Sequence, residues 1–191
     1  MAVVPIKSNS IIALDASPIV AQAAGEGGPA DCKVNDGIIP TTANTPAASI
    51  GSVFQFVRVP SNCKIKKLYF ESGAQAAGTM NLGVYYATDG SNPNGVPTAA
   101  TGIANAVVGS PPGNQVNTSL FGSAIALTAA SGPTDVTNQS GNYTADKRQL
   151  PLWKACGLNS DPGGFFDISG TLAAAITTGG GLMGLTVMYT D

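Results

Sequence analysis

The strongest constraint on the fold is a strict alternation of residue types in two segments near the C-terminus. In residues 166–176 the even positions are mostly apolar, and the odd positions carry Asp, Ser, Thr or Ala. Residues 183–189 resume the alternation after a run of three glycines. A period of two places successive side chains on opposite faces of a β-strand. We therefore predict strands near 165–177 and 182–190, joined as an antiparallel hairpin with one buried face.

Earlier segments carry strand signals of the same kind. Residues 53–59 and 65–70 are rich in β-branched and aromatic residues and flank the turn sequence at 60–62, so we expect them to form a hairpin. Residues 81–87 alternate, and 120–127 is a further expected strand. With 24 Gly and 13 Pro to supply turns, the chain is predicted to be all-β. The expected architecture is an antiparallel β-sandwich, jelly-roll-like, with an extended N-terminal arm.

Residues 150–157 are the one candidate for a helix. Pro151 suits a first helical turn, and Gly157 suits the position after a helix end. Trp153, the single tryptophan, is expected to close one end of the sandwich. The predicted core residues of this helix and of the two C-terminal strands are Trp153, Phe166, Ile168, Leu172, Leu185 and Val187.

The first 53 residues contain no Phe, Tyr or Trp, and prolines interrupt them repeatedly. Aromatic side chains supply much of the buried area of a core, so the packed domain is expected to begin near residue 50. We predict an extended arm at 1–50 and a β-sandwich domain at 51–191. Three apolar pairs make the arm too apolar for a free linker, and they are expected to contact a partner surface: Ile11 with Ile12, Ile19 with Val20, and Ile38 with Ile39.

The residue types that most catalysis requires are scarce. The chain has no histidine and only two glutamates, Glu26 and Glu71. A Ser-His-Asp or Cys-His pair and a His-ligated metal are therefore excluded. Cys32, Cys63 and Cys156 lie far apart, without metal-binding spacing, and are expected to be thiols in a reducing compartment. We predict no enzymatic activity, no catalytic residue, no metal, no cofactor and no small-molecule substrate.

A local basic cluster is formed by Arg58, Lys64, Lys66 and Lys67, against Glu71. It is interpreted either as a solvated strand edge or as a patch that faces an acidic protein partner. Nucleic-acid binding would need a larger patch with interleaved aromatic residues, and the sequence pI near 4.9 opposes it. No run of 18 apolar residues is present, so no membrane-spanning helix is expected.

The order of several short motifs resembles that of a group of tailed-bacteriophage virion proteins, over residues 50–191. The motifs are Phe54–Asn62 followed by Ile65, Gly83–Tyr85, Leu120–Ala124, Leu152-Trp153, Gly157-Leu158, Asp161–Gly163, Asp167-Ile168 and Val187–Tyr189.

The resemblance implies a structural virion protein, with capsid decoration (cement) as the expected role. Such a protein would bind the outer surface of the head, after synthesis in the host bacterial cytoplasm, and stabilise contacts between major capsid subunits. Its expected partners are the major capsid protein and copies of itself, as a dimer or trimer. Two alternatives stay open: a tail or baseplate protein that binds a receptor, and a secreted carbohydrate-binding module. The resemblance supplies no catalytic residues.

Overall fold

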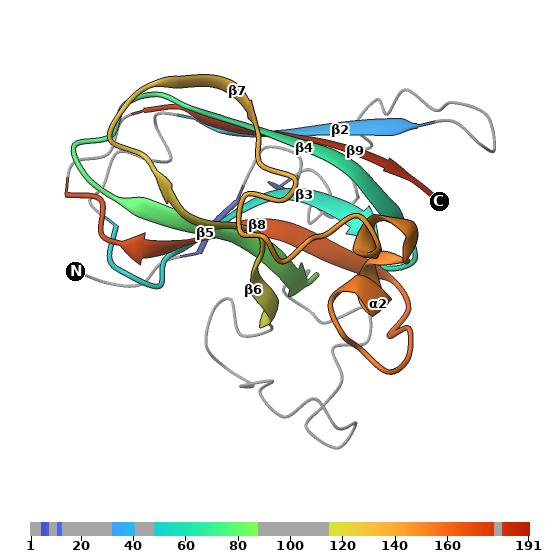
Figure 1. Cartoon of the computed structure of the whole chain (residues 1–191). Coiled ribbons are helices and arrows are strands. Elements are labelled where there is room, and N and C mark those ends of the chain that lie inside the picture. Colours follow the sequence, from blue (N-terminus) through green and yellow to red (C-terminus); the bar gives the residue numbers. More distant parts are fainter. Residues whose placement is uncertain (1–4, 8–10, 13–31, 41–47, 88–114, 178–180) are drawn as a thin grey trace.

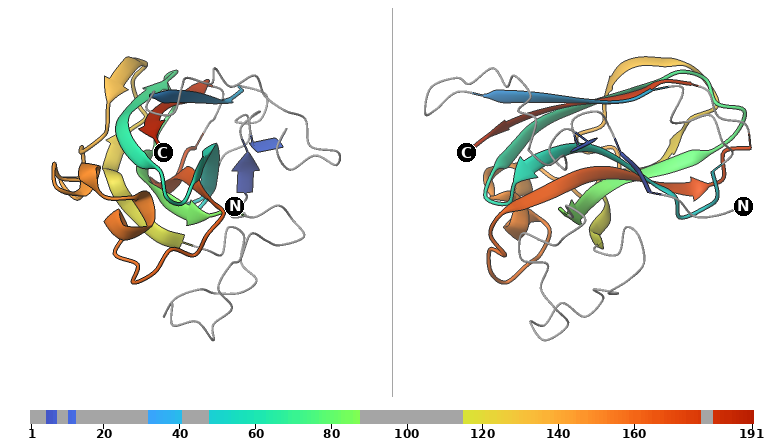
Figure 2. Two further views of the ribbon diagram at one scale, coloured as in Figure 1. Left: turned by 90° about the vertical axis from the view of Figure 1, so that its right-hand side faces the viewer. Right: turned by 180° about the vertical axis from the view of Figure 1, so that it is seen from behind.

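The computed structural model describes residues 5–7, 11–12, 32–40, 48–87, 115–177 and 181–191. Within these ranges, strands form two layers packed face to face (Figure 1, Figure 2). Sheet A has the strand order β1-β3-β8-β5-β6, and sheet B has the order β2-β9-β4-β7. The strands are β1 (Pro5–Lys7), β2 (Lys33–Ile39), β3 (Val53–Pro60), β4 (Lys64–Ser72), β5 (Thr79–Tyr86), β6 (Gln115–Ala126), β7 (Ser131–Asp135), β8 (Phe165–Ala174) and β9 (Met183–Thr190).

The prediction of an all-β sandwich is confirmed, and each expected strand is present with its bounds shifted by a few residues. Two short helices follow β7: the 3-10 turn η2 (Lys147–Gln149) and α2 (Leu152–Ala155), which lies within the expected helix. No helix in the described ranges is long and apolar enough to cross a membrane.

The connectivity is that of a jelly roll. When β2 to β9 are renumbered 1 to 8 in chain order, sheet B reads 1-8-3-6, and sheet A without β1 reads 2-7-4-5. This is the jelly-roll order of eight strands, in which most successive strands alternate between the two sheets. Among these eight strands only β5 and β6 are both consecutive in the chain and neighbours in a sheet.

This connectivity corrects both predicted hairpins. Strand β8 lies between β3 and β5 in sheet A, whereas β9 lies between β2 and β4 in sheet B. Likewise β3 belongs to sheet A and β4 to sheet B. The alternation marked the inward faces of β8 and β9 correctly, but these two faces meet across the core. They are not neighbours within one sheet.

Strand β2 also corrects the expected division at residue 50. Residues 33–39 pair antiparallel with β9 over seven positions and so supply an edge strand of the sandwich, inside the segment expected to be an arm. Ile39 is fully buried in the common core. Strand β1 lies parallel to β3 at the edge of sheet A. Residues 33–39 lack a clear alternation in sequence, and their strand conformation follows from pairing with β9.

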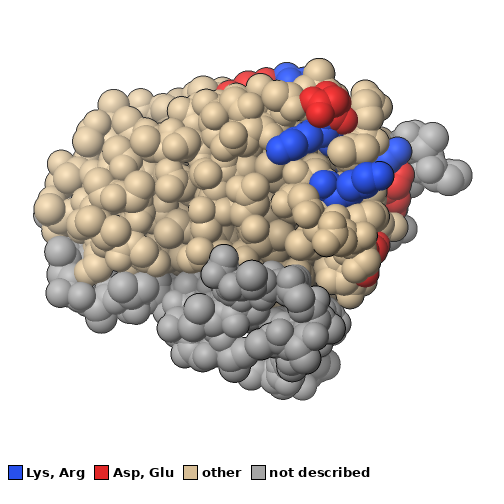
Figure 3. Space-filling view, turned by 60° about the horizontal axis from the view of Figure 1, so that its bottom comes forward, with Lys and Arg blue, Asp and Glu red and all other residues tan. Residues whose placement is uncertain are grey.

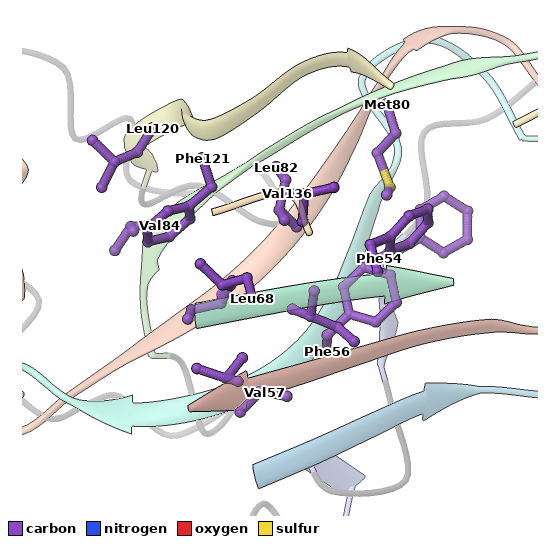
Figure 4. Close-up of a cluster of buried hydrophobic side chains, with 14 of the residues drawn as sticks. Phe54, Phe56, Val57, Leu68, Met80, Leu82, Val84, Leu120, Phe121 and Val136 are labelled. Carbon is purple, nitrogen blue, oxygen red and sulfur yellow. The ribbon is translucent and has the colours of Figure 1, made fainter. Parts of the chain in front are cut away.

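The core between the sheets is built from side chains of both layers. Figure 4 shows residues of β3 and β5 together with Leu68 of β4 and Val136 in one cluster. The rings of Phe56 from sheet A and Phe70 from sheet B meet edge to face, with centroids 6.0 Å apart. Such a pair adds a directional contact to the hydrophobic burial, and it joins the two layers directly.

The two sheets approach closely at Gly37. Phe56 lies at a bulge in β3, between Gln55 and Val57, and a Cβ at position 37 would lie 2.1 Å from its carbonyl oxygen. A side chain at Gly37 would therefore force the backbones of β2 and β3 apart. Glycine is required here for close approach, since its φ is not in the left-handed region.

We expect Gly37→Ala to lower the free energy of unfolding by about 1–3 kcal/mol, the usual cost of overpacking. Urea denaturation monitored by Trp153 fluorescence measures it. Gly132→Ala is the matched control, because a Cβ there meets no atom within 4 Å. Equal stability of the two variants would contradict the close approach of β2 to β3.

Candidate functional site

Among the described residues, cysteines and acidic side chains are the ones that could hold a metal. No cluster of three or more Cys, Asp or Glu side chains suited to a metal occurs among them. Burial raises the pKa of the Cys156 thiol to about 12 and that of Cys63 still further. Both thiols are therefore neutral near pH 7 and are poor nucleophiles. The surfaces of this part of the chain are its other candidate functional features.

The predicted basic cluster is divided by the fold. Arg58 is almost fully buried on sheet A, where its Nε donates to Asp167 Oδ1 at 2.7 Å and its Nη2 donates to Oδ2 at 3.1 Å. Its grouping with the lysines as an exposed patch is therefore wrong. Asp167 has no exposed surface, although the alternation of β8 indicated a solvated position. The strand register explains the pair, because Arg58 lies directly opposite Asp167.

A second polar contact lies in the same strands. Tyr85 of β5 lies opposite Asp167 on the other side of β8, and its hydroxyl contacts that of Thr171. Burial raises the pKa of Tyr85 to about 12. The side chains of Gln55 and Ser169 are also buried here. The polar face of β8 is thus covered at Asp167 and Ser169, whereas Thr171 is partly exposed.

The three lysines of β4 are joined by basic residues from distant parts of the sequence. Strand β4 contributes Lys64, Lys66 and Lys67, which are partly exposed. Helix η2 packs against β4 and α2, and the two helices bring three further basic side chains. We call these six residues the basic end: Lys64, Lys66, Lys67, Lys147, Arg148 and Lys154.

Figure 3 shows Lys and Arg side chains, with Asp and Glu side chains beside them, gathered at one end of a face whose other described residues are almost all uncharged. Backbone contacts hold the elements of the basic end in place. Tyr143 lies just before η2 in the chain, and its hydroxyl donates to the carbonyl of Ile65 on β4 at 3.1 Å. The Leu152 N–H donates to the carbonyl of Cys63 at 2.7 Å, at the start of β4. Sequence reasoning did not place Lys147, Arg148 and Lys154 beside β4, because about 80 residues separate η2 and α2 from that strand.

Asp135 of β7 is the main acidic neighbour of the basic end. It accepts hydrogen bonds from the Lys67 ammonium and from the Thr137 hydroxyl and N–H. The bond from Lys67, followed by that from Thr137, lowers the pKa of Asp135 from 3.8 to about 2. Both side chains of the pair are about 40% exposed, so water screens the interaction strongly.

We expect Asp135 to add less than about 1 kcal/mol of stability, and only while it is ionised. Because its pKa is lower in the folded chain, this contribution is complete above pH 4 and disappears as the pH falls to about 2. The measurement is the difference in unfolding free energy between the protein and Asp135→Asn, from pH 7 down to pH 2. A difference that stays constant across that range would contradict the assignment.

The residues expected to contact a partner from the arm do not share one environment. Ile11 and Ile39 are buried within the chain itself. Ile12 and Ile38 are 58% and 40% exposed. Ile19 and Val20 lie outside the described residues. Of the four arm residues that the structure describes, Ile12 and Ile38 therefore lie at the surface.

The residues expected in the core lie as follows. Phe166, Ile168, Leu172, Leu185 and Val187 are buried between the sheets. Trp153 of α2 is half-buried and packs against the edge of that core, beside Leu152 and Ala155, which are fully buried.

The outer edge of β6 is partly covered by the segment that follows β7. The Ser140 N–H donates to the carbonyl of Phe121 at 2.9 Å, and the Asn142 side chain donates to that of Ser119 at 3.2 Å. The Gln139 side chain accepts from the Ser123 N–H at 2.6 Å. Covered edges do not pair with strands of other chains. This part of β6 is therefore not a site of sheet extension.

The fold of the chain is similar to that of proteins of known structure. No protein-family model matches the sequence, and no curated protein sequence matches it. Among solved structures, the chain is similar to a chain in the capsid of Ralstonia phage GP4, with a TM-score of 0.63 and 13% sequence identity over 98% of each chain. It also aligns with a chain in the cyanophage Pam1 capsid asymmetric unit, with a TM-score of 0.46 and 16% identity over 91% of this chain and 94% of that one. The first likeness shows a shared fold along nearly the full length.

Proposed function

We propose that this protein is a structural component of a phage virion, acting as a capsid decoration (cement) protein. In this role it binds the outer surface of the head and stabilises contacts between major capsid subunits. The supporting observation is the shared fold with a chain in the Ralstonia phage GP4 capsid, which extends over 98% of both chains.

The chemistry of the described residues supports the same proposal. In sheet A the buried side chains of Arg58 and Asp167 pair with each other. The thiols of Cys63 and Cys156 are neutral near pH 7. What the molecule presents instead is a rigid sandwich with a charged end and a largely uncharged face (Figure 3). Such features suit a protein whose task is to bind other proteins.

The copy number of the protein in purified particles tests the proposal. Quantitative mass spectrometry should find it in hundreds of copies per particle, in a fixed ratio to the major capsid protein. Antibody labelling of intact particles should decorate the head. A few copies at the tail would identify a tail or baseplate protein instead. Absence from particles, with binding to glycans, would favour a secreted carbohydrate-binding module.

The stabilising role needs a separate experiment. Particles assembled without this protein should release their DNA at a lower temperature than complete particles, and adding the purified protein should restore the difference. Unchanged release temperatures would leave the protein as a component of the head without a cement function.

A further inference from the structure

The basic end concentrates charge that the rest of the protein lacks. It holds six of the nine Lys and Arg residues of a chain whose formal net charge is −2. Of the remaining three, Arg58 is buried against Asp167, Lys33 pairs with Asp191, and Lys7 lies on β1 at the edge of sheet A. Within the part of the chain that the structure describes, basic residues are therefore concentrated at one end of a protein that is acidic overall.

Folding does not account for this concentration. Lys66, Lys147 and Lys154 form no salt bridge with any residue that the structure describes. The Arg148 guanidinium lies near enough to Lys67 to act against its protonation, although Asp135 outweighs it and raises the Lys67 pKa. Like charges held together repel one another, which destabilises the folded chain.

The local acidic groups neutralise the basic end only in part. Asp135 pairs with Lys67, and Asp146 hydrogen-bonds the Thr144 hydroxyl. Asp161 accepts a hydrogen bond from Ser61 at 2.7 Å. These carboxylates leave an excess of positive charge, which an opposing acidic surface would compensate.

The support beneath these charges is rigid. Helices η2 and α2 are attached to the start of β4 by the hydrogen bonds of Tyr143 and Leu152, and the Trp153 N–H donates to the carbonyl of Ser61 at 3.1 Å. Leu152 and Ala155 anchor α2 in the core. A backbone that is held in place before binding loses less entropy when a complex forms.

We propose that the basic end docks this protein onto an acidic protein surface of the particle. The partner chemistry is a cluster of Asp and Glu carboxylates on a folded neighbour. The inference rests on the proposed virion role and adds to it the face by which the protein is attached. Complementary charge directs such encounters and sets the orientation of the bound protein.

The same charges fit nucleic acid poorly. Carboxylates lie among the basic residues, and the acidic remainder of the chain repels a polyanion. Single-stranded nucleic acid would require exposed aromatic rings for stacking, whereas Trp153 is half-buried against the core. An acidic protein surface, with charges spaced among neutral groups, matches the basic end better.

Binding to particles that lack the protein provides the first test. A triple variant with Lys66→Glu, Lys147→Glu and Lys154→Glu should bind such particles at least about tenfold more weakly than the wild type. A matched triple with Arg at the same positions keeps the charge and should bind within about threefold of the wild type. Raising the salt from about 0.05 M to about 0.3 M should weaken the wild type much more than the Glu triple. Superimposable circular dichroism spectra and melting curves would establish that all three proteins are folded.

The outcomes separate this inference from the proposed function. If the wild type and the Glu triple bind particles equally well, the virion role stands and the basic end is not the attachment face. If the wild type neither binds particles nor occurs in virions, the proposed function fails.

In that second case a binding assay independent of particles decides the inference. Fluorescence anisotropy with a labelled oligoglutamate peptide should show salt-dependent binding to the wild type that the Glu triple loses. Equal binding by the two proteins would overturn the proposal. So would a duplex DNA that binds the wild type more tightly than the acidic peptide does.

Discussion

Replacing Arg58 with alanine is expected to lower the free energy of unfolding by about 3–5 kcal/mol. The change would leave the Asp167 carboxylate without its bidentate partner at a position that has no exposed surface. A buried charge stripped of its partner keeps its full desolvation cost. Because a domain of this kind is stable by about 5–15 kcal/mol in total, the loss should be evident in urea denaturation.

Two controls make that result specific. Lys67→Ala breaks an ion pair whose members are about 40% exposed, and it should cost less than about 1 kcal/mol. A double variant with Arg58→Met and Asp167→Leu removes both charges and should be more stable than Arg58→Ala, because apolar replacements of a buried pair avoid an uncompensated charge. A loss below about 1 kcal/mol for Arg58→Ala would show that the pair is solvated and that sheet A is covered less completely than described.

The alternation of side chains predicted which residues face the core but not which strands pair. Ile168 and Leu185 are both buried, as the period of two indicates. The hydrogen-bond partners of their strands come from elsewhere, since β8 pairs with β3 and β5 while β9 pairs with β2 and β4. Side-chain periodicity reports burial, whereas pairing depends on contacts between distant segments. A short glycine-rich connection can either join neighbouring strands or cross between sheets.

The polar positions of β8 illustrate a second limit of the sequence. Asp167 occupies the face opposite to Ile168, so alternation places it outside the main core. The period of two does not reveal whether that second face meets solvent. At Asp167 it does not, because Arg58 and Tyr85 on the flanking strands lie beside Asp167 and all three are buried.

The candidate surface could be predicted only in part. The lysines at 64–67 are close in sequence and were identifiable as a basic cluster. Lys147, Arg148 and Lys154 join them only because η2 and α2 fold back against β4. Arg58 leaves the cluster because a β-bulge and the register of β3 turn it toward Asp167. The basic residues could be identified from the sequence, but which of them lie together in space could be determined only from the fold.

Strand β2 provides the sharpest test of how the N-terminal segment is used. Ile38 and Ile39 are adjacent in sequence, and an arm that lies on a partner would use them alike. In the structure Ile39 is fully buried between the sheets, whereas Ile38 is 40% exposed on the outer face of sheet B. The pairing of β2 with β9 sets this difference, because neighbouring residues of a strand point to opposite faces.

Ile39→Asp should therefore cost several kcal/mol, because it places an unpaired carboxylate in the core and removes a buried side chain. Ile38→Asp should change the unfolding free energy by less than about 1 kcal/mol, as expected for a half-exposed position. Urea denaturation of the full chain measures both. A sandwich built from residues 51–191 alone would tolerate the two substitutions equally, and that outcome would return β2 to the arm. A large loss of stability at Ile39, with tolerance at Ile38, would establish residues 33–39 as part of the sandwich. Deleting residues 33–39 would then remove one of the eight jelly-roll strands. Such a deletion could not separate an attachment arm from the fold.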